Sequence, residues 1–209
     1  MTAPLAPPPT VAAPIAPPPT VAPPALMTLA DYLAYENSDD DRPCELNHGV
    51  LTPMPPESRL NARIAMRILR SLMAFFPDER LGCKDTEVAV MGHRATVRVP
   101  DVLVLSPELA EILEQRGRST VLLEMPPPVL AIEVVSPGKA AADRDYRYKR
   151  SEYAARGIGE YWIVDPVQGQ VTVLVLVDGF YEARVCQGDD RLESPLVPDF
   201  PLTVQDILS

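Results

Sequence analysis

The chain has 209 residues, of which 19 are Lys or Arg and 29 are Asp or Glu, and its formal net charge at pH 7 is −10. This acidic balance argues against a broad, non-specific nucleic-acid-binding surface but allows a local basic groove. Two histidines and three widely separated cysteines argue against a multi-histidine metal site, a zinc site and a disulfide framework. No stretch is apolar and long enough to span a membrane, so we expect a cytoplasmic protein with reduced thiols.

The first 26 residues differ in composition from the rest of the chain. They contain 10 of the 25 prolines and no charged residue, and the heptapeptide Ala-Pro-Pro-Pro-Thr-Val-Ala occurs at 6–12 and again at 16–22. Proline fixes φ and removes a backbone donor, so such a segment cannot build a hydrophobic core. We therefore expect an extended arm at 1–26, followed by a single domain at 27–209.

Two local patterns open this domain. Thr28 is suited to cap a short helix over 29–36. The triplet Asn47-His48-Gly49, which lies between Leu46 and the pair Val50-Leu51, predicts a tight turn that joins two short strands. Glu45 lies at the edge of the first of these strands and, taken by itself, is typical of a surface position.

The clearest helix is predicted over 59–76, where Pro77 ends it. Its expected core stripe consists of Leu60, Ile64, Ile68 and Leu72. A second stripe beside it consists of Arg59, Arg63, Arg67 and Arg70. The usual interpretation of such a row is a solvated flank, and the functional alternative is an edge that follows phosphates.

Two strands are expected next, at 87–90 and at 97–105, and a polar helix follows at 108–115. The second strand contains Pro100, which removes a ladder hydrogen bond and so indicates an edge or a bulge, where a side chain is often redirected. Asp101 comes directly after this proline and directly before the run Val-Leu-Val-Leu. It is therefore a carboxylate at the entrance of a hydrophobic strand.

The run 129–135 is β-branched and apolar on both alternating faces, and prolines lie on either side of it. This pattern predicts a short strand that is covered on both sides. Glu133 interrupts the pattern. Because an unpartnered buried carboxylate costs roughly 3–5 kcal/mol, we expect this residue to have a function.

A helix that ends at Gly157 is predicted after this strand. The residues expected on its inward face, at spacings of four, three and four, are Ala142, Tyr146, Lys149 and Tyr153. The basic residues expected on its flanks are Arg144, Arg147 and Arg150. Lys149 alone is interpreted most simply as a snorkelling lysine or as the i,i+4 partner of Asp145. The nearby Glu133 favours a buried pair instead.

The C-terminal part is predicted to contain a strand at 161–164 and then two strands, 171–177 and 180–185, around Asp178-Gly179. This dipeptide is a strong signal for a two-residue β-hairpin. A short helix over 202–208 is expected to close the chain.

Four residues carry the functional hypothesis: Asp101 and Glu133 on two strands, Lys149 on the following helix, and Glu45 upstream. Carboxylate oxygens suit hard cations such as Mg²⁺ or Mn²⁺. A bound cation activates water and neutralises charge on a phosphodiester, and a lysine adds a positive charge close by. The spacing alone is suggestive but not specific.

From about Leu29 to Leu208, the sequence resembles the Uma-two family of restriction endonucleases, a branch of the PD-(D/E)XK nuclease superfamily. The motifs that carry the resemblance are Glu45-Leu-Asn-His-Gly-Val-Leu, Pro100-Asp101-Val, Ile132-Glu133-Val-Val-Ser-Pro137, Asp145-Tyr-Arg-Tyr-Lys149 with Tyr153, and Gly157-Ile-Gly-Glu-Tyr-Trp-Ile-Val-Asp-Pro166. Together they are far more specific than any one of them.

The resemblance implies an α/β, restriction-endonuclease-like core, in which a mixed β-sheet is flanked by helices and the hairpin is C-terminal. It also implies a metal-dependent nuclease site that acts on DNA with Mg²⁺ or Mn²⁺. Asp101 matches the motif aspartate, Glu133 the second acid and Glu45 the helper acid. A homodimer is expected if the protein cuts both strands.

Two positions depart from the pattern of the family. The superfamily motif places lysine two residues after the acid, where this chain has Val135, and Lys149 is the expected substitute. Lys139 competes for this role but is expected in a loop with no reason to point inward. His48 stands where the family commonly has aspartate, and we expect this change to affect only the turn.

The main alternative is a catalytically silent module that keeps the nuclease fold and binds nucleic acid or protein. The acidic net charge and the displaced lysine favour it. Dinucleotide-binding, nucleophile-elbow and phosphate-loop motifs do not occur in the sequence, so other enzyme classes receive no support.

Overall fold

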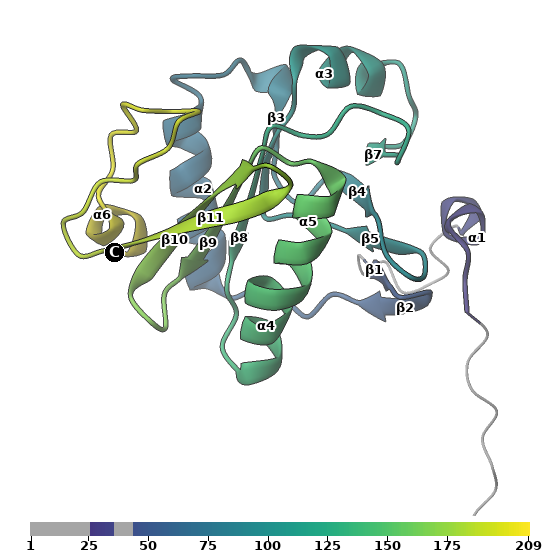
Figure 1. Ribbon diagram of the computed structural model, residues 1–209, viewed down its shortest axis with the longest axis horizontal. Coiled ribbons are helices and arrows are strands. Elements are labelled where there is room, and N and C mark those ends of the chain that lie inside the picture. Colours follow the sequence, from purple (N-terminus) through teal and green to yellow (C-terminus); the bar gives the residue numbers. More distant parts are fainter. Residues whose placement is uncertain (1–25, 36–43) are drawn as a thin grey trace, which may run out of the picture.

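The computed structural model describes residues 26–35 and 44–209. The arm predicted at 1–26 therefore lies, except for its last residue, outside the described residues. The described part folds into two mixed β-sheets flanked by helices, which confirms the predicted α/β class (Figure 1).

The larger sheet positions most of the candidate site. Its strands are β3 (Leu81–Gly82), β6 (Val102–Val104), β8 (Leu130–Val134), β9 (Glu160–Asp165), β10 (Gln170–Val177) and β11 (Phe180–Gln187). Their order is β11-β10-β9-β8-β6-β3, and among them only β8 and β9 pair in parallel. Strands β10 and β11 form the predicted C-terminal hairpin, whose turn residues Asp178 and Gly179 both have positive φ.

The smaller sheet lies beside it and contributes the N-terminal part of the site. Its strands are β1 (Cys44–Asn47), β2 (Val50–Pro53), β4 (Glu87–Val90), β5 (Thr96–Arg98) and β7 (Thr120–Val121), in the order β2-β1-β5-β4-β7. The predicted turn joins β1 to β2, with φ of 50° at His48 and 82° at Gly49. Gly49 suits this conformation because it has no Cβ.

The helices cover both faces of the larger sheet. The α-helices are α1 (Leu29–Ala34), α2 (Arg59–Leu72), α3 (Pro107–Glu114), α4 (Lys139–Asp143), α5 (Arg150–Arg156) and α6 (Val204–Leu208). There is also a 3-10 turn, η1 (Asp78–Arg80), and a π-helix, η2 (Arg144–Lys149). Thr28 caps α1 in a reciprocal capping box with Asp31, as expected for this helix start.

Hydrophobic side chains fill the space on both faces of the larger sheet. Helices α2 and α6 pack on one face, and helices α3 and α5 pack on the other (Figure 1). Consecutive residues of β8 alternate between these two clusters, with Ile132 in the first and Ala131 in the second. All five residues of β8 are buried, so the prediction of a strand covered on both sides is confirmed.

The prediction of a single strand over 97–105 is wrong. This segment is divided into β5, which belongs to the smaller sheet, and β6, which belongs to the larger one. Residues 99–101 pass from one sheet to the other, and Pro100 suits this passage because it has no amide hydrogen for a ladder bond. The break places Asp101 at the junction of the two sheets.

Helix α2 is shorter than predicted, because it ends at Leu72 and not at residue 76. The amides of Phe75 and Phe76 both donate to the Leu72 carbonyl, which tightens the chain into a turn before Pro77. Leu60 is 41% exposed and does not belong to the core stripe. Asn61 is buried in its place, and its side-chain amide donates to the Val134 carbonyl at 3.4 Å.

The arginine stripe of α2 is partly structural. The Arg67 guanidinium donates to the Ile207 carbonyl at 2.7 Å, and that of Arg63 donates to the Ser209 carbonyl at 3.3 Å. These carbonyls lie at the C-terminal end of α6, where positive charges are favourable. Two of the four arginines thus hold α6 against α2.

The helical segment that follows β8 is not a regular α-helix. It consists of α4, the six-residue π-helix η2 and α5, and it begins at Lys139, which the sequence placed in a loop. A π-helix closes i→i+5 hydrogen bonds and so shifts the angular position of the residues after it. Asp145, Lys149, Glu152 and Tyr153 are all buried in this segment.

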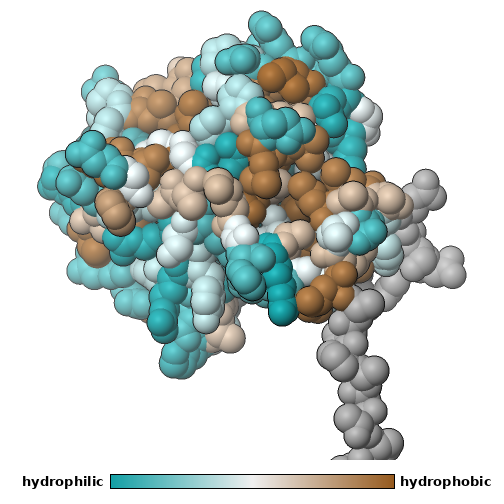
Figure 2. Space-filling view, turned by 45° about the vertical axis from the view of Figure 1, so that its right-hand side comes forward, coloured by the Kyte–Doolittle hydropathy of each residue, from teal (hydrophilic) through white to brown (hydrophobic). Residues whose placement is uncertain are grey.

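No helix within residues 26–35 and 44–209 is long and apolar enough to cross a membrane. The face in Figure 2 carries hydrophobic residues interspersed with hydrophilic ones. The most exposed of the large hydrophobic side chains among the described residues is Phe180, at 78%, on the edge strand β11.

Candidate active site

The register of the larger sheet brings Asp101 and Glu133 together. Val102 of β6 pairs with Ile132 of β8 in antiparallel orientation, so Asp101 and Glu133 stand opposite one another on the same face. The Val134 amide donates to Asp101 Oδ2 at 2.5 Å, which fixes this carboxylate against β8. The two acids predicted from the sequence therefore line one cleft.

Glu133 is buried and points to the side of the sheet that α5 covers. Its Oε1 accepts hydrogen bonds from the Lys149 ammonium and from the Tyr153 hydroxyl, both at 2.7 Å. Burial, with a smaller contribution from the nearby Asp101 and Asp145, raises the pKa of Glu133 to about 8 against the opposing charge of Lys149. This carboxyl therefore holds a proton at a pH where an exposed glutamate has lost it.

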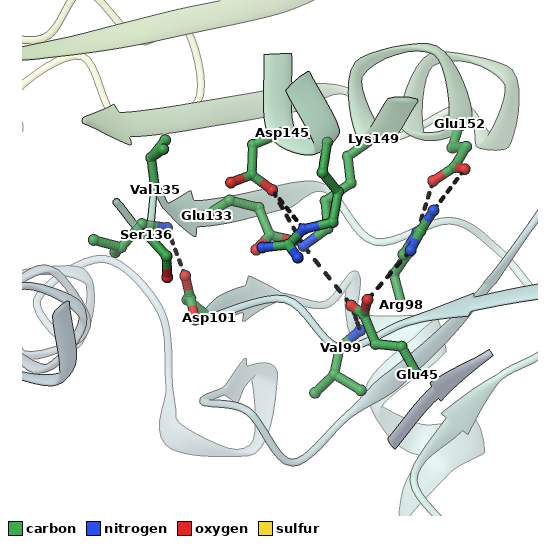
Figure 3. A network of polar contacts seen from close by, with 12 residues as sticks. Glu45, Arg98, Val99, Asp101, Glu133, Val135, Ser136, Asp145, Lys149 and Glu152 are labelled. Atoms are coloured by element: carbon green, nitrogen blue, oxygen red, sulfur yellow. Dashed lines mark hydrogen bonds and ion pairs between the residues drawn. The ribbon is translucent and has the colours of Figure 1, made fainter. Parts of the chain in front are cut away.

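Lys149 lies in the π-helix, is only 3% exposed and points into the cleft. Its Nζ lies 2.7 Å from Glu133 Oε1, 3.6 Å from Asp145 Oδ1 and 3.8 Å from Glu45 Oε1 (Figure 3). Burial acts to lower the pKa of Lys149, but these carboxylates outweigh it and raise the pKa. The amine is therefore charged. Lys139, the competing residue, is exposed and pairs with Asp143 on α4.

Glu45 is buried and so is not the surface residue that its position in the strand suggested. Its Oε1 accepts from the Val99 amide at 3.2 Å, and its Oε2 accepts from Arg98 at 3.2 Å. Although burial acts against ionisation, the charges of Lys149 and Arg98 keep the pKa of Glu45 below its usual value. His48 is exposed in the β1–β2 turn and does not line this cleft.

The sequence did not single out the buried pair of Arg98 and Glu152. The Arg98 guanidinium is 1% exposed and donates to both carboxylate oxygens of Glu152 at 2.8 Å (Figure 3). It also reaches Glu45, so it links β5, β1 and α5. Neither residue interrupts a long apolar run as Glu133 does, so no local signal identified the pair.

The sequence also did not single out three further charged residues, two that line the cleft and one that contacts its lining. Asp145 is 2% exposed, and burial raises its pKa. Arg144, expected on a flank of the helix, lines the cleft and lies 3.4 Å from Asp145. Lys84, in the loop between β3 and β4, lies 2.9 Å from Asp101 Oδ1. Their spacing in the sequence resembles that of ordinary surface charges.

At this cleft, ion pairs join seven described side chains into one network around Arg98 and Lys149, and they join Lys84, Glu57 and Asp101 into a separate group beside it. The acidic members of the two groups are Glu45, Glu57, Asp101, Glu133, Asp145 and Glu152, and the basic members are Lys84, Arg98, Arg144 and Lys149. When every member is ionised, six negative charges face four positive ones. The two uncompensated charges match one divalent cation, which is a favourable feature for a metal site.

The donors at this cleft also suit Mg²⁺ or Mn²⁺. Within the described ranges, no three His, Cys, Asp or Glu side chains gather closely enough to form a complete metal cage. Mg²⁺ keeps several waters and binds through one or two carboxylates together with substrate oxygens. Asp101 and Glu133 would supply those carboxylates, so the residues present fit this cation.

The raised pKa of Glu133 predicts a specific dependence of stability on pH. Between its ordinary value of 4.5 and about 8, the folded protein binds more protons at this group than the unfolded chain does. Glu133 therefore lowers the free energy of unfolding as pH rises through this range, by up to about 1.4 kcal/mol per pH unit. Glu133→Gln removes this slope. Urea unfolding of both proteins in EDTA between pH 5 and 8.5 measures it, and parallel stability curves would contradict it.

Comparison with known proteins agrees with this architecture. Residues 29–205 match the Uma2 family, which is described as "Putative restriction endonuclease". A solved structure described as "a putative nuclease belonging to DUF820", from Anabaena variabilis, is similar with a TM-score of 0.68 and 16% sequence identity. The similarity covers 87% of this chain and 97% of that one. No curated protein matches the chain. Because the family match extends over most of the sequence, the chain belongs to the Uma2 family of nuclease-fold proteins.

Proposed function

We propose that the protein is an endodeoxyribonuclease that hydrolyses DNA phosphodiester bonds with the help of Mg²⁺ or Mn²⁺. The observation that supports this most directly is the convergence of Asp101, Glu133 and Lys149 in one cleft. Two acids and one amine form a donor set suited to a hard cation and a phosphate. The family match supports a nuclease in general, whereas the cation, the DNA substrate and the residue roles are our proposals.

Asp101 and Glu133 are the proposed cation ligands. Their backbones are fixed by the antiparallel pairing of β6 with β8, so the separation of their carboxylates is set by the sheet. When bound, the cation supplies a more acidic water and neutralises negative charge on the phosphate. Ionised Glu133 is required for this, and Lys149 at 2.7 Å favours the ionised form.

Lys149 is the proposed third catalytic group. Its amine is charged and has three donors, so it can hold Glu133 and also donate a hydrogen bond to the attacking water or to a phosphate oxygen. Glu45 and Asp145 lie 3.8 and 3.6 Å from the amine and, together with Glu133, keep it charged. Glu45 therefore acts as a helper acid that positions Lys149.

We also propose that the protein works as a homodimer in the cytoplasm, because cutting both DNA strands uses two active sites. The edge strand β11 supports such an assembly. It is eight residues long, and its Phe180 and Val185 are exposed. An exposed edge strand of this length is able to pair with a second copy of itself.

The proposal predicts different behaviour of two lysine variants in a cleavage assay with plasmid and linear DNA. Lys149→Met removes the amine from the cleft and is expected to lower the cleavage rate at least about 100-fold. Lys139→Met, the matched control, removes an exposed lysine and is expected to cleave as fast as the wild type. EDTA is expected to stop cleavage by the wild type and by Lys139→Met.

Two results would overturn this proposal. If the folded wild-type protein leaves varied DNA substrates intact with Mg²⁺ and with Mn²⁺, the chain is the silent module that keeps the fold. If Lys149→Met and Lys139→Met cleave equally well, the amine of Lys149 has no part in the reaction.

A further inference from the structure

Lys84 occupies an unexpected place beside the proposed cation ligands. Its ammonium lies 2.9 Å from Asp101 Oδ1 and also pairs with Glu57, which precedes α2. The Lys84 side chain is 25% exposed and does not itself line the cleft, but both of its partners, Asp101 and Glu57, do. It comes from the loop between β3 and β4, away from every motif that carries the family resemblance.

The backbone around Lys84 holds the residue in an uncommon conformation. Its φ is 58°, in the left-handed region that a residue with a side chain rarely adopts. The Asp85 carboxylate stabilises this turn, because its Oδ1 accepts from the Cys83 amide at 3.0 Å and from the Thr86 hydroxyl at 3.1 Å. A strained position that neighbouring groups maintain in this way often has a function.

With the Lys84 ion pair, both carboxylate oxygens of Asp101 have a partner. Oδ2 accepts from the Val134 amide, and Oδ1 faces the Lys84 ammonium. A divalent cation that binds Asp101 must therefore approach a lysine that already neutralises the same carboxylate. Two positive charges at neighbouring positions repel one another, more strongly here than in bulk water because the cleft is partly buried.

We propose that Lys84 is an internal counter-ion of the cation site. It neutralises Asp101 in the metal-free protein, and when the cation binds it gives up its contact with Asp101 and keeps its contact with Glu57. Glu57 gives the displaced ammonium a partner, so its charge stays compensated in both states. This inference rests on the proposed function, since it assigns to Lys84 the control of cation affinity at the same site.

The test is calorimetric titration of metal-free, full-length protein with Mn²⁺ in the absence of DNA. Lys84→Met keeps the length of the side chain and removes its charge, so Mn²⁺ is expected to bind about tenfold more tightly. Lys139→Met is the matched control, because it removes an exposed lysine whose ion pair lies on α4. It is expected to bind Mn²⁺ as the wild type does.

A second readout is the melting temperature with and without Mn²⁺. A tighter site gives a larger stabilisation at the same cation concentration, so the rise in Tm is expected to be greater for Lys84→Met than for the wild type. This difference keeps the test informative even if the variant is less stable without metal.

The outcomes separate this inference from the proposed function. Equal Mn²⁺ affinity of the wild type and Lys84→Met overturns the counter-ion and leaves the cation site standing. Binding by Lys84→Met alone supports the counter-ion and the cation site. Absence of binding in both proteins overturns both, because there is then no cation for Lys84 to oppose.

Discussion

Glu133→Gln is expected to bind Mn²⁺ much more weakly than the wild type and to cleave DNA about 1,000-fold more slowly. The glutamine oxygen can still accept from Lys149 and Tyr153, so the shape of the cleft is kept. The negative charge that would hold the cation is lost. The cation then no longer stabilises the transition state, and a 1,000-fold slower reaction corresponds to a loss of about 4 kcal/mol of this stabilisation.

The matched control for this variant is Glu160→Gln. Glu160 is also a buried strand glutamate, but it accepts from Ser194 and Trp162 and does not line the cleft. It is expected to bind Mn²⁺ with the affinity of the wild type. Calorimetry and a cleavage time course measure both effects, and circular dichroism confirms that each variant is folded. Wild-type cleavage by Glu133→Gln would exclude this acid as a cation ligand.

Arg98→Met is expected to cause the largest loss of stability of any single substitution in the network, roughly 3–5 kcal/mol. The guanidinium is 1% exposed, so its removal leaves the carboxylates of Glu45 and Glu152 buried without this partner. Because a domain is stable by only about 5–15 kcal/mol, this variant is expected to unfold at a much lower urea concentration.

Two comparisons show whether uncompensated charge causes this loss. Arg118→Met removes a guanidinium that is 38% exposed and pairs with Glu87, so a loss of about 1 kcal/mol is expected. The double variant Arg98→Met/Glu152→Met removes one of the stranded carboxylates and is expected to be more stable than Arg98→Met alone. An equal loss for Arg98→Met and Arg118→Met would contradict the assignment.

The candidate residues that the sequence singled out are those that interrupt a regular pattern. Glu133 is the one charged residue in a buried apolar strand, and Lys149 is the basic residue on the inward face of a helix. Asp101 follows a proline at the entrance to a hydrophobic strand. In each case the local pattern assigns burial, and the cost of burying a charge indicates a partner.

The rest of the site depends on contacts between segments that are distant in the sequence. Arg98 meets Glu152 across 54 positions, and Lys84 meets Asp101 only because β3 and β6 are neighbours in the larger sheet. The division of 97–105 between two sheets is a consequence of tertiary packing. A π-helix brings residues five apart together, so Arg144 and Lys149 both line the cleft, which α-helical spacing does not predict.

The network of charges also spans the junction between the two sheets. Glu45 and Arg98 belong to the smaller sheet, Glu133 belongs to the larger one, and Lys149 contacts an acid from each. Any shear between the sheets therefore alters the distances on which this chemistry depends. A cation or phosphate bound in the cleft would hold the two sheets together. The junction between the sheets would then be more rigid with the ligand bound than with hydrophobic packing alone.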